Sequence, residues 1–155
     1  QLRCITFYSH PTNSQAIVDT LVVKYKTRSL TKEHIKTTEY TVNFFPNYDF
    51  FFESKHRNTY YNGKVTIDFE GGIKNIVSDT KSFGTIHTHS ITDIINQPGF
   101  QTNWFASKDK VKGCQDCEFR YTCFDTRPLS FNKADQLYES EIECDYNPYT
   151  AQWAN

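Results

Sequence analysis

The 155-residue chain contains no methionine, and it lacks long apolar runs, glycine- or proline-rich tracts and an excess of charge of either sign. No stretch approaches the roughly 20 apolar residues that a transmembrane helix needs, and the N-terminus lacks the basic, apolar and cleavage regions of a signal peptide. A formal net charge of −1 provides no field that attracts nucleic acid or an anionic membrane. We therefore expect a cytoplasmic protein with neither nucleic acid nor membrane as a partner.

The missing methionine includes position 1, so we expect the chain to be part of a longer protein or a processed product. With 37% apolar residues, it has enough nonpolar side chains to build a core. Its length predicts one compact domain, with a C-terminal lobe that could be semi-independent. No internal repeat or linker marks a boundary, so motifs have to supply one.

Local patterns predict a mixture of strands and short helices. β-branched and aromatic residues predict strands at 3–8, 20–26 and 40–45, and alternation around Glu70-Gly71-Gly72 predicts a hairpin of residues 64–68 and 73–77. Ser90 predicts the start of a short helix, a second helix is expected over 100–105, and 132–140 has a weaker helical pattern. The aromatic run 40–52 forms either core or a peptide groove. We predict an α+β fold, with a small β-sheet and hairpin region followed by a short-helix, cysteine-rich lobe.

Four of the five cysteines follow the pattern C-x2-C-x5-C, with the fourth after a gap of 20 residues: Cys114, Cys117, Cys123 and Cys144. Thiols two residues apart can point from one tight turn at the same ion. Four thiolates complete a zinc site or hold a 4Fe-4S cluster, and spacing alone does not choose between them. Disulfides are the remaining alternative, but a cytosolic chain keeps its thiols reduced. Cys4, within a predicted strand, is expected to be a buried, inert thiol.

Other candidate chemistry is weaker. His87-Thr88-His89 would place two imidazoles on one face of a strand, and these could form a metal site together with His10, His34 or His56. Surface histidines explain the pattern better, because no carboxylate accompanies them at metal-site spacing. The chain has no phosphate-binding loop, nucleophile elbow or compelling carboxylate pair. Sequence alone does not show how the carboxylates of Asp68, Glu118 and Asp125 lie relative to other groups, and we assign no catalytic residue.

The run Cys114–Cys123, followed by Cys144-Asp-Tyr-Asn-Pro-Tyr149, resembles the C-terminal half of a SPASM domain. SPASM domains follow a radical SAM barrel in many peptide-maturing enzymes and hold auxiliary 4Fe-4S clusters. The runs Phe83-Gly-Thr-Ile86, Ser90-Ile91, Trp104 and Lys108-Asp109 are similar to the SPASM protein of grasp-with-spasm systems, whose partner is an ATP-grasp peptide ligase. The similarity begins at Asn58. It therefore implies a SPASM-like domain over 58–155, after a β-rich region over 1–57 that would be a remnant of the end of a radical SAM-type barrel.

The resemblance implies that one 4Fe-4S cluster, with zinc as the alternative, is bound by Cys114, Cys117, Cys123 and Cys144. A full SPASM domain has further cysteines near Tyr60, at Ile76 and near Thr126 or Arg127, and this chain has none there. The chain also lacks the C-x3-C-x2-C triad, so it should not start radical chemistry by itself, and whether it is an enzyme stays open. Lys110, Lys112 and Arg120 either stabilise the anionic centre or form a solvated face.

The function implied is that of an auxiliary iron–sulfur domain or accessory protein in the maturation of a ribosomally synthesised peptide. Its partners would be the precursor peptide and an ATP-grasp peptide ligase, and its role would be peptide binding, structural support or electron relay. An exposed strand edge could bind the peptide by β-addition. The alternative is a non-redox adaptor in which zinc fastens the fold.

Overall fold

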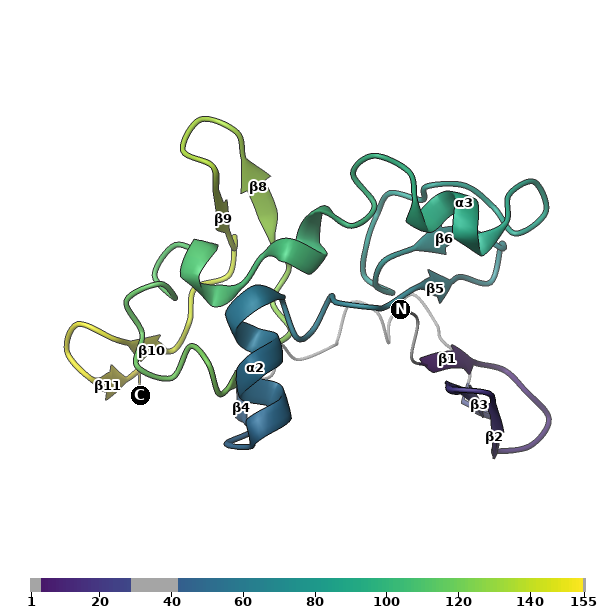
Figure 1. Ribbon diagram of the computed structural model, residues 1–155, viewed down its shortest axis with the longest axis horizontal. Coiled ribbons are helices and arrows are strands. Elements are labelled where there is room, and N and C mark those ends of the chain that lie inside the picture. The colour runs from purple at the N-terminus through teal and green to yellow at the C-terminus, as the bar shows by residue number, and fades with distance from the viewer. Residues whose placement is uncertain (1–3, 29–41, 155) are drawn as a thin grey trace. The chain divides into compact units, whose positions relative to one another are not determined.

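The computed structural model describes residues 4–28 and 42–154. The fold is α+β, as expected, and Figure 1 shows its short strands and helices. The chain divides into two compact units, each built from two segments. Among the described residues, one unit comprises 4–28 and 63–101, and the other comprises 42–62 and 102–154.

The first unit opens with a three-stranded sheet of β1 (Cys4–Phe7), β2 (Ser14–Val18) and β3 (Leu21–Tyr25), in the order β1-β3-β2. β1 runs parallel to β3, and β2 runs antiparallel to it. The strands expected near 3–8 and 20–26 are therefore confirmed. Sequence patterns missed β2 because it follows a proline and an asparagine, and all five of its residues are exposed.

The second segment of this unit contains the predicted hairpin, formed by β5 (Thr66–Ile67) and β6 (Ile73–Lys74), which are shorter than expected. Asp68 closes the turn, since its Oδ1 accepts from Gly72 N at 2.7 Å. The predicted helix is α3 (Ile91–Ile95), and Ser90 caps it by accepting from Asp93 N at 3.1 Å. Fully buried side chains of Ile73, Ile94 and Phe100 belong to this unit.

The second unit contains the other helices and strands that the structure describes. They are β4 (Val42–Phe44), α2 (Tyr48–His56), the 3-10 helices η1 (Thr102–Phe105) and η2 (Lys108–Lys110), β7 (Cys123–Asp125), β8 (Ser130–Asn132), β9 (Leu137–Glu139), β10 (Tyr146–Asn147) and β11 (Gln152–Trp153). The strands pair antiparallel as β4-β7, β8-β9 and β10-β11. The helix expected over 100–105 is thus only the single 3-10 turn η1.

The prediction of a helix over 132–140 was wrong, because these residues complete the β8-β9 hairpin. The side chains of Asn132 and Asp135 accept from Ala134 N and Leu137 N at 3.0 and 3.1 Å, which favours turns over a helix. Gln136 has a φ of 60°, which a right-handed helix does not allow.

The aromatic run contains a helix that sequence patterns did not predict. The part of the strand expected at 40–45 that lies within the described residues is β4, and Asn47 then caps α2 by accepting from Phe50 N at 2.9 Å. Phe51 packs edge-to-face on Tyr121, at 5.5 Å between ring centroids. In contrast, Tyr48 is 76% exposed. The run is therefore neither wholly core nor wholly surface.

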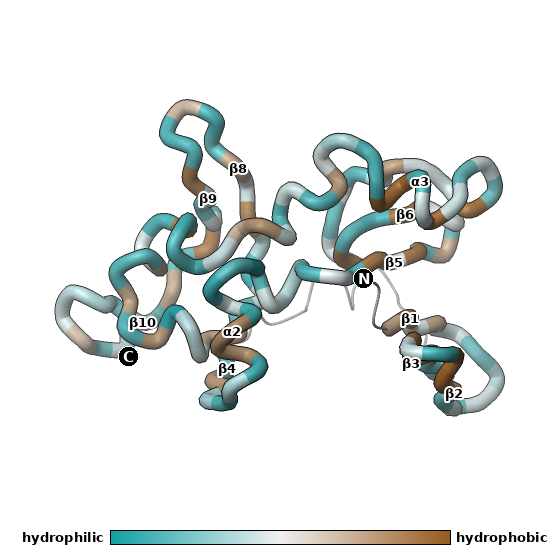
Figure 2. The backbone as a smooth tube through the Cα atoms, viewed as in Figure 1, coloured by the Kyte–Doolittle hydropathy of each residue, from teal (hydrophilic) through white to brown (hydrophobic). Residues whose placement is uncertain are grey.

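Hydrophilic residues interrupt the hydrophobic segments throughout the coloured parts of the backbone tube in Figure 2. Within 4–28 and 42–154, no helix has the length and apolar character that crossing a membrane requires.

Candidate metal centre

Consecutive tight turns place the first two cysteines. Cys114 N and Gln115 N both donate to Val111 O at 3.0 Å, and Cys117 N donates to Cys114 O at 3.0 Å. Gly113 has a φ of 75°, a conformation that side chains disfavour, and it allows the chain to enter the first turn. These bonds turn the backbone so that residues 114 and 117 lie on the same loop.

Cys123 is held from the other side by β4 and α2. It begins β7, pairs with Phe44 of β4, and donates its N–H to Phe119 O at 2.9 Å. The buried hydroxyl of Ser54 on α2 lies 2.9 Å from Tyr121 O, two residues before the cysteine. The unexpected helix therefore supports the third thiol.

Cys144 precedes β10, and the β10-β11 hairpin fixes it next to the loop that carries Cys114 and Cys117, which we call the knuckle. The Tyr146 phenol donates to the Glu118 carboxylate, and the Tyr149 phenol donates to Asp116 Oδ2 at 2.7 Å. Because Asp116 and Glu118 flank Cys117, these two bonds hold the fourth cysteine's segment to the loop of the second. The bond to Glu118 raises the pKa of Tyr146 to about 12 and lowers that of Glu118.

All four predicted cysteines line one cavity of about 490 Å³. Cys144 is exposed, the other three are partly buried, and none forms a disulfide. Aromatic side chains form part of the wall: Phe44, Phe119, Tyr146, Tyr149 and Trp153. Within the part of the chain that the structure describes, no three His, Cys, Asp or Glu side chains converge as they would around one metal ion. The four thiols therefore share a cavity without meeting at a point.

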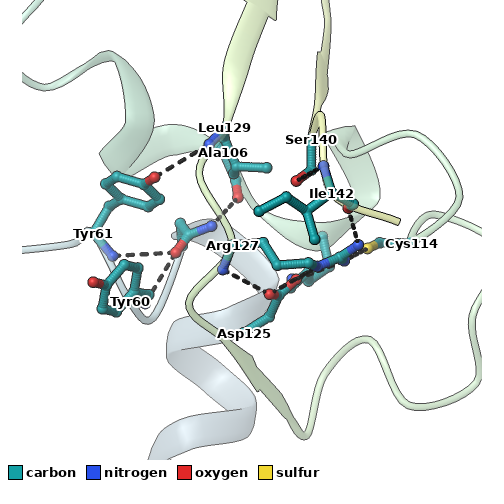
Figure 3. A network of polar contacts seen from close by, with 11 residues as sticks. Tyr60, Tyr61, Ala106, Cys114, Asp125, Arg127, Leu129, Ser140 and Ile142 are labelled. Atoms are coloured by element: carbon teal, nitrogen blue, oxygen red, sulfur yellow. Dashed lines mark hydrogen bonds and ion pairs between the residues drawn. The ribbon is translucent and has the colours of Figure 1, made fainter. Parts of the chain in front are cut away.

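A buried network of charges lies beside the thiols, and Figure 3 shows most of it. Lys108 Nζ donates to Asp125 Oδ2 at 2.5 Å, and Arg127 Nη2 donates to the same oxygen at 2.8 Å. These three residues are between 3% and 7% exposed. Burial alone would raise the pKa of Asp125, but its bonds to Arg127 and Lys108 lower it to about 2. The network therefore carries two positive charges and one negative charge.

Burial and neighbouring charges act on two of the thiols, those of Cys123 and Cys117. Burial raises the pKa of Cys123 to about 12, and nearby Asp125, Cys114 and Cys144 add to the shift while Lys108 opposes it. Burial also raises the pKa of Cys117, to which Cys114 and Cys144 contribute. Metal-free thiols of this kind stay protonated at neutral pH, so binding a metal would release their protons.

Two of the three cations singled out in the sequence, Lys112 and Arg120, have other partners. Lys112 pairs with Asp135 and Glu139 at 2.8 and 3.2 Å, and Lys110 is exposed. Arg120 donates to Asp109 Oδ1 at 3.1 Å and to the Cys117 carbonyl at 2.9 Å, so it supports the knuckle through its backbone rather than its sulfur.

Sequence patterns did not assign Lys108 or Arg127 to the site. The signals for Lys108 were its place in the charged segment before Cys114 and in the run that resembles the grasp-with-spasm protein, and for Arg127 the resemblance implied only a nearby position where a cysteine was expected. Asp125 was noted in the sequence only as an acidic residue, with no predicted contacts. Burial in a shared network identifies all three residues.

Among the described residues, none of the remaining candidates lines this cavity. Cys4 is partly exposed rather than buried, and its sulfur lies 3.9 Å from Thr6 Oγ1. The predicted strand at His87-Thr88-His89 is instead a turn, where both histidines are exposed and His89 Nδ1 bonds the Thr88 hydroxyl at 2.7 Å. His10 bonds Thr12 O at 2.8 Å, and His34 lies outside the described residues.

No family model matches the chain, and comparisons with curated proteins and with solved structures found no match either. The donor chemistry is the remaining guide to the site. Four cysteine thiols in one cavity, next to buried cations, suit a thiolate-bound metal group in number and in charge.

Proposed function

We propose that this chain is a SPASM-like accessory domain or protein for the maturation of a ribosomally synthesised peptide, acting beside an ATP-grasp peptide ligase in the cytoplasm. In this proposal Cys114, Cys117, Cys123 and Cys144 hold one 4Fe-4S cluster. Such a cluster supplies electron relay or a structural fastening. The single observation that carries the proposal is that four thiols up to 30 positions apart in the sequence line one cavity.

The charge balance supports an anionic metal group. Four thiolates around a 2+ core leave a net charge of about −2. The Lys108–Asp125–Arg127 network supplies +1 next to it, because two buried cations share one carboxylate. A buried anion without such partners would be costly. A zinc ion with four thiolates has the same net charge, so the charges do not distinguish the two metals.

The precursor peptide has a candidate binding edge in β2, an outer strand of the three-stranded sheet. All five of its residues are exposed, including Ile17 at 70% and Val18 at 57%. An extended peptide that added to this edge would gain main-chain hydrogen bonds from β2 and apolar contacts from these two side chains.

A second candidate function is a zinc-fastened adaptor, and the small core of the second unit favours it. Ala106, Val111 and Tyr138 form the buried cluster next to the knuckle, with Cys114 and Leu129 packed against it. Few apolar residues and many short strands leave a small unit dependent on a staple. Structural zinc contributes on the order of 10 kcal/mol to the folding of such units.

The deciding experiment is metal analysis and visible absorption of protein purified without oxygen. We would compare the wild type with Cys117→Ala, and use Cys4→Ser as the matched control because Cys4 lies in the other unit. About four irons and four sulfides per chain, lost in Cys117→Ala and kept in Cys4→Ser, would support the cluster. One zinc and no colour would favour the adaptor, and no metal in the wild type would overturn both.

A further inference from the structure

The guanidinium of Arg127 contacts three chain segments that carry proposed ligands. Nε and Nη2 bond the two carboxylate oxygens of Asp125, two residues after Cys123, at 3.0 and 2.8 Å. Nη1 donates to Ile142 O, two residues before Cys144, at 2.9 Å. Nη2 also lies 3.7 Å from Cys114 Sγ, within donor distance of a sulfur. Figure 3 shows these contacts meeting at one side chain.

This side chain is rigidly held. Arg127 is 7% exposed, and its own backbone N–H donates to Asp125 Oδ1 at 2.9 Å. The main chain and the side chain of Arg127 therefore both bind the carboxylate of Asp125. Lys108 binds that carboxylate from the 3-10 helix η2, ahead of the knuckle. A planar fork with five donors can join separate segments in this way, whereas a lysine acts as a point charge.

We propose that Arg127 is a positioning residue for the thiolate-bound group, gathering the segments of Cys114, Cys123 and Cys144 and donating a hydrogen bond to the Cys114 sulfur. The inference rests on the proposed function, since it requires that these cysteines hold a metal. Groups that orient ligands in this way usually account for about 10- to 100-fold in metal affinity.

The fork and its charge can be separated by mutation. Arg127→Gln removes both but leaves the Lys108–Asp125 pair intact, so no buried charge loses its partner. Arg127→Gln combined with Asp125→Asn removes the fork and preserves the net charge of +1 through Lys108. Lys112→Gln is the matched control, because Lys112 also lines the cavity but has an exposed side chain paired to Asp135 and Glu139.

We would measure the rate of metal transfer to a chelator in protein loaded without oxygen, and check folding by circular dichroism and gel filtration. The single and the double variant should both lose metal about tenfold faster than the wild type, and Lys112→Gln should match the wild type. If the bound group is an iron–sulfur cluster, the double variant should also have a lower reduction potential, since it loses a hydrogen bond to sulfur at constant charge.

Each failure has its own signature. A loaded wild type whose folded Arg127 variants release metal at the same rate would overturn the role of Arg127 and leave the proposed function standing. Slow release from the double variant alone would mean that charge, not the fork, acts on the site, and this also overturns the proposal. A wild type that binds neither iron nor zinc overturns both. If zinc is bound, the same rates decide the role of Arg127.

Discussion

Asp125 is the shared partner of two buried cations, Lys108 and Arg127. Removing Asp125 should therefore lower the free energy of unfolding more than removing one of the cations does. Asp125→Ala leaves Lys108 and Arg127 buried without a counter-ion, and we expect it to lower the free energy of unfolding by about 3–5 kcal/mol. Lys108→Met leaves Asp125 bound to Arg127 and should cost about 1 kcal/mol. Urea denaturation of the metal-free protein, in which no anionic centre offsets the two cations, measures both, and equal losses would contradict the shared-partner network.

Asp79 provides a pH-dependent prediction away from the cysteines. Burial raises the pKa of its carboxyl above the ordinary value, against opposing hydrogen bonds that include one from Ile76 N to Oδ2 at 3.1 Å. The folded state therefore binds this proton more tightly than the unfolded state does. The resulting stabilisation is complete below the unfolded pKa of Asp79 and is lost as pH rises through its raised folded pKa.

Asp79→Asn keeps an oxygen that can accept from Ile76 N but cannot ionise. We expect the variant to lack this fall in stability and to be at least as stable as the wild type at neutral pH. The free energy of unfolding, measured from about pH 4 to pH 7 for both proteins, tests the difference in slope. Glu70→Gln, a change on an exposed side chain, is the control, and parallel wild-type and Asp79→Asn curves would refute the prediction.

At the scale of elements, the turn between β2 and β3 has one strained position. Asp19 has a φ of 54° and Thr20 does not share that left-handed conformation. Asp19→Gly should therefore stabilise the protein by about 0.5–1 kcal/mol, since glycine adopts this conformation without a steric penalty. Thr20→Gly, one residue on, should destabilise it. Thermal unfolding of the two variants distinguishes the positions, and a loss of stability in both would count against the turn described.

Elements whose signals are local could be predicted from the sequence. The cap at Ser90 and the turn from Asp68 to Gly72 both depend on side chains within four residues of the backbone groups that they bind. The helix α2 was missed because its aromatic residues favour strands, whereas Ser54 docks it on Tyr121, far away in the sequence. At 132–140, side chain to backbone bonds and the pairing of β8 with β9 outweighed a weak helical pattern.

The candidate site likewise has residues that the sequence predicted and a residue that it did not. Cysteine spacing predicted four thiols that the structure brings to one cavity, because two of them lie on one short turn. Arg127 could not be chosen from the sequence, since its partners Cys114 and Ile142 stand 13 and 15 positions away. A residue that acts through several distant contacts has no local pattern.

At the scale of the whole molecule, the four cysteines belong to one of the two compact units. If these cysteines hold the proposed metal group, its removal should loosen that unit and leave the other nearly unchanged. We expect hydrogen exchange at the amides of Cys117 and Cys123 to quicken about tenfold or more after chelation, while exchange across Leu21–Tyr25 stays within twofold. Faster exchange throughout both units would instead mean that the centre stabilises the chain as one cooperative body.

The β8-β9 hairpin lies between the third and fourth thiols, and it has a consequence for how such centres vary among proteins. Ser130 pairs with Glu139, so the chain returns to its starting point before it reaches Cys144. Residues added at the tip of the hairpin lengthen the interval in sequence but hardly change the distance that the chain must span, and the entropy of closing the ring grows slowly with its length. The gap of 20 residues could thus lengthen at little cost in folding free energy. A motif that fixes this gap would overlook proteins that have the same centre.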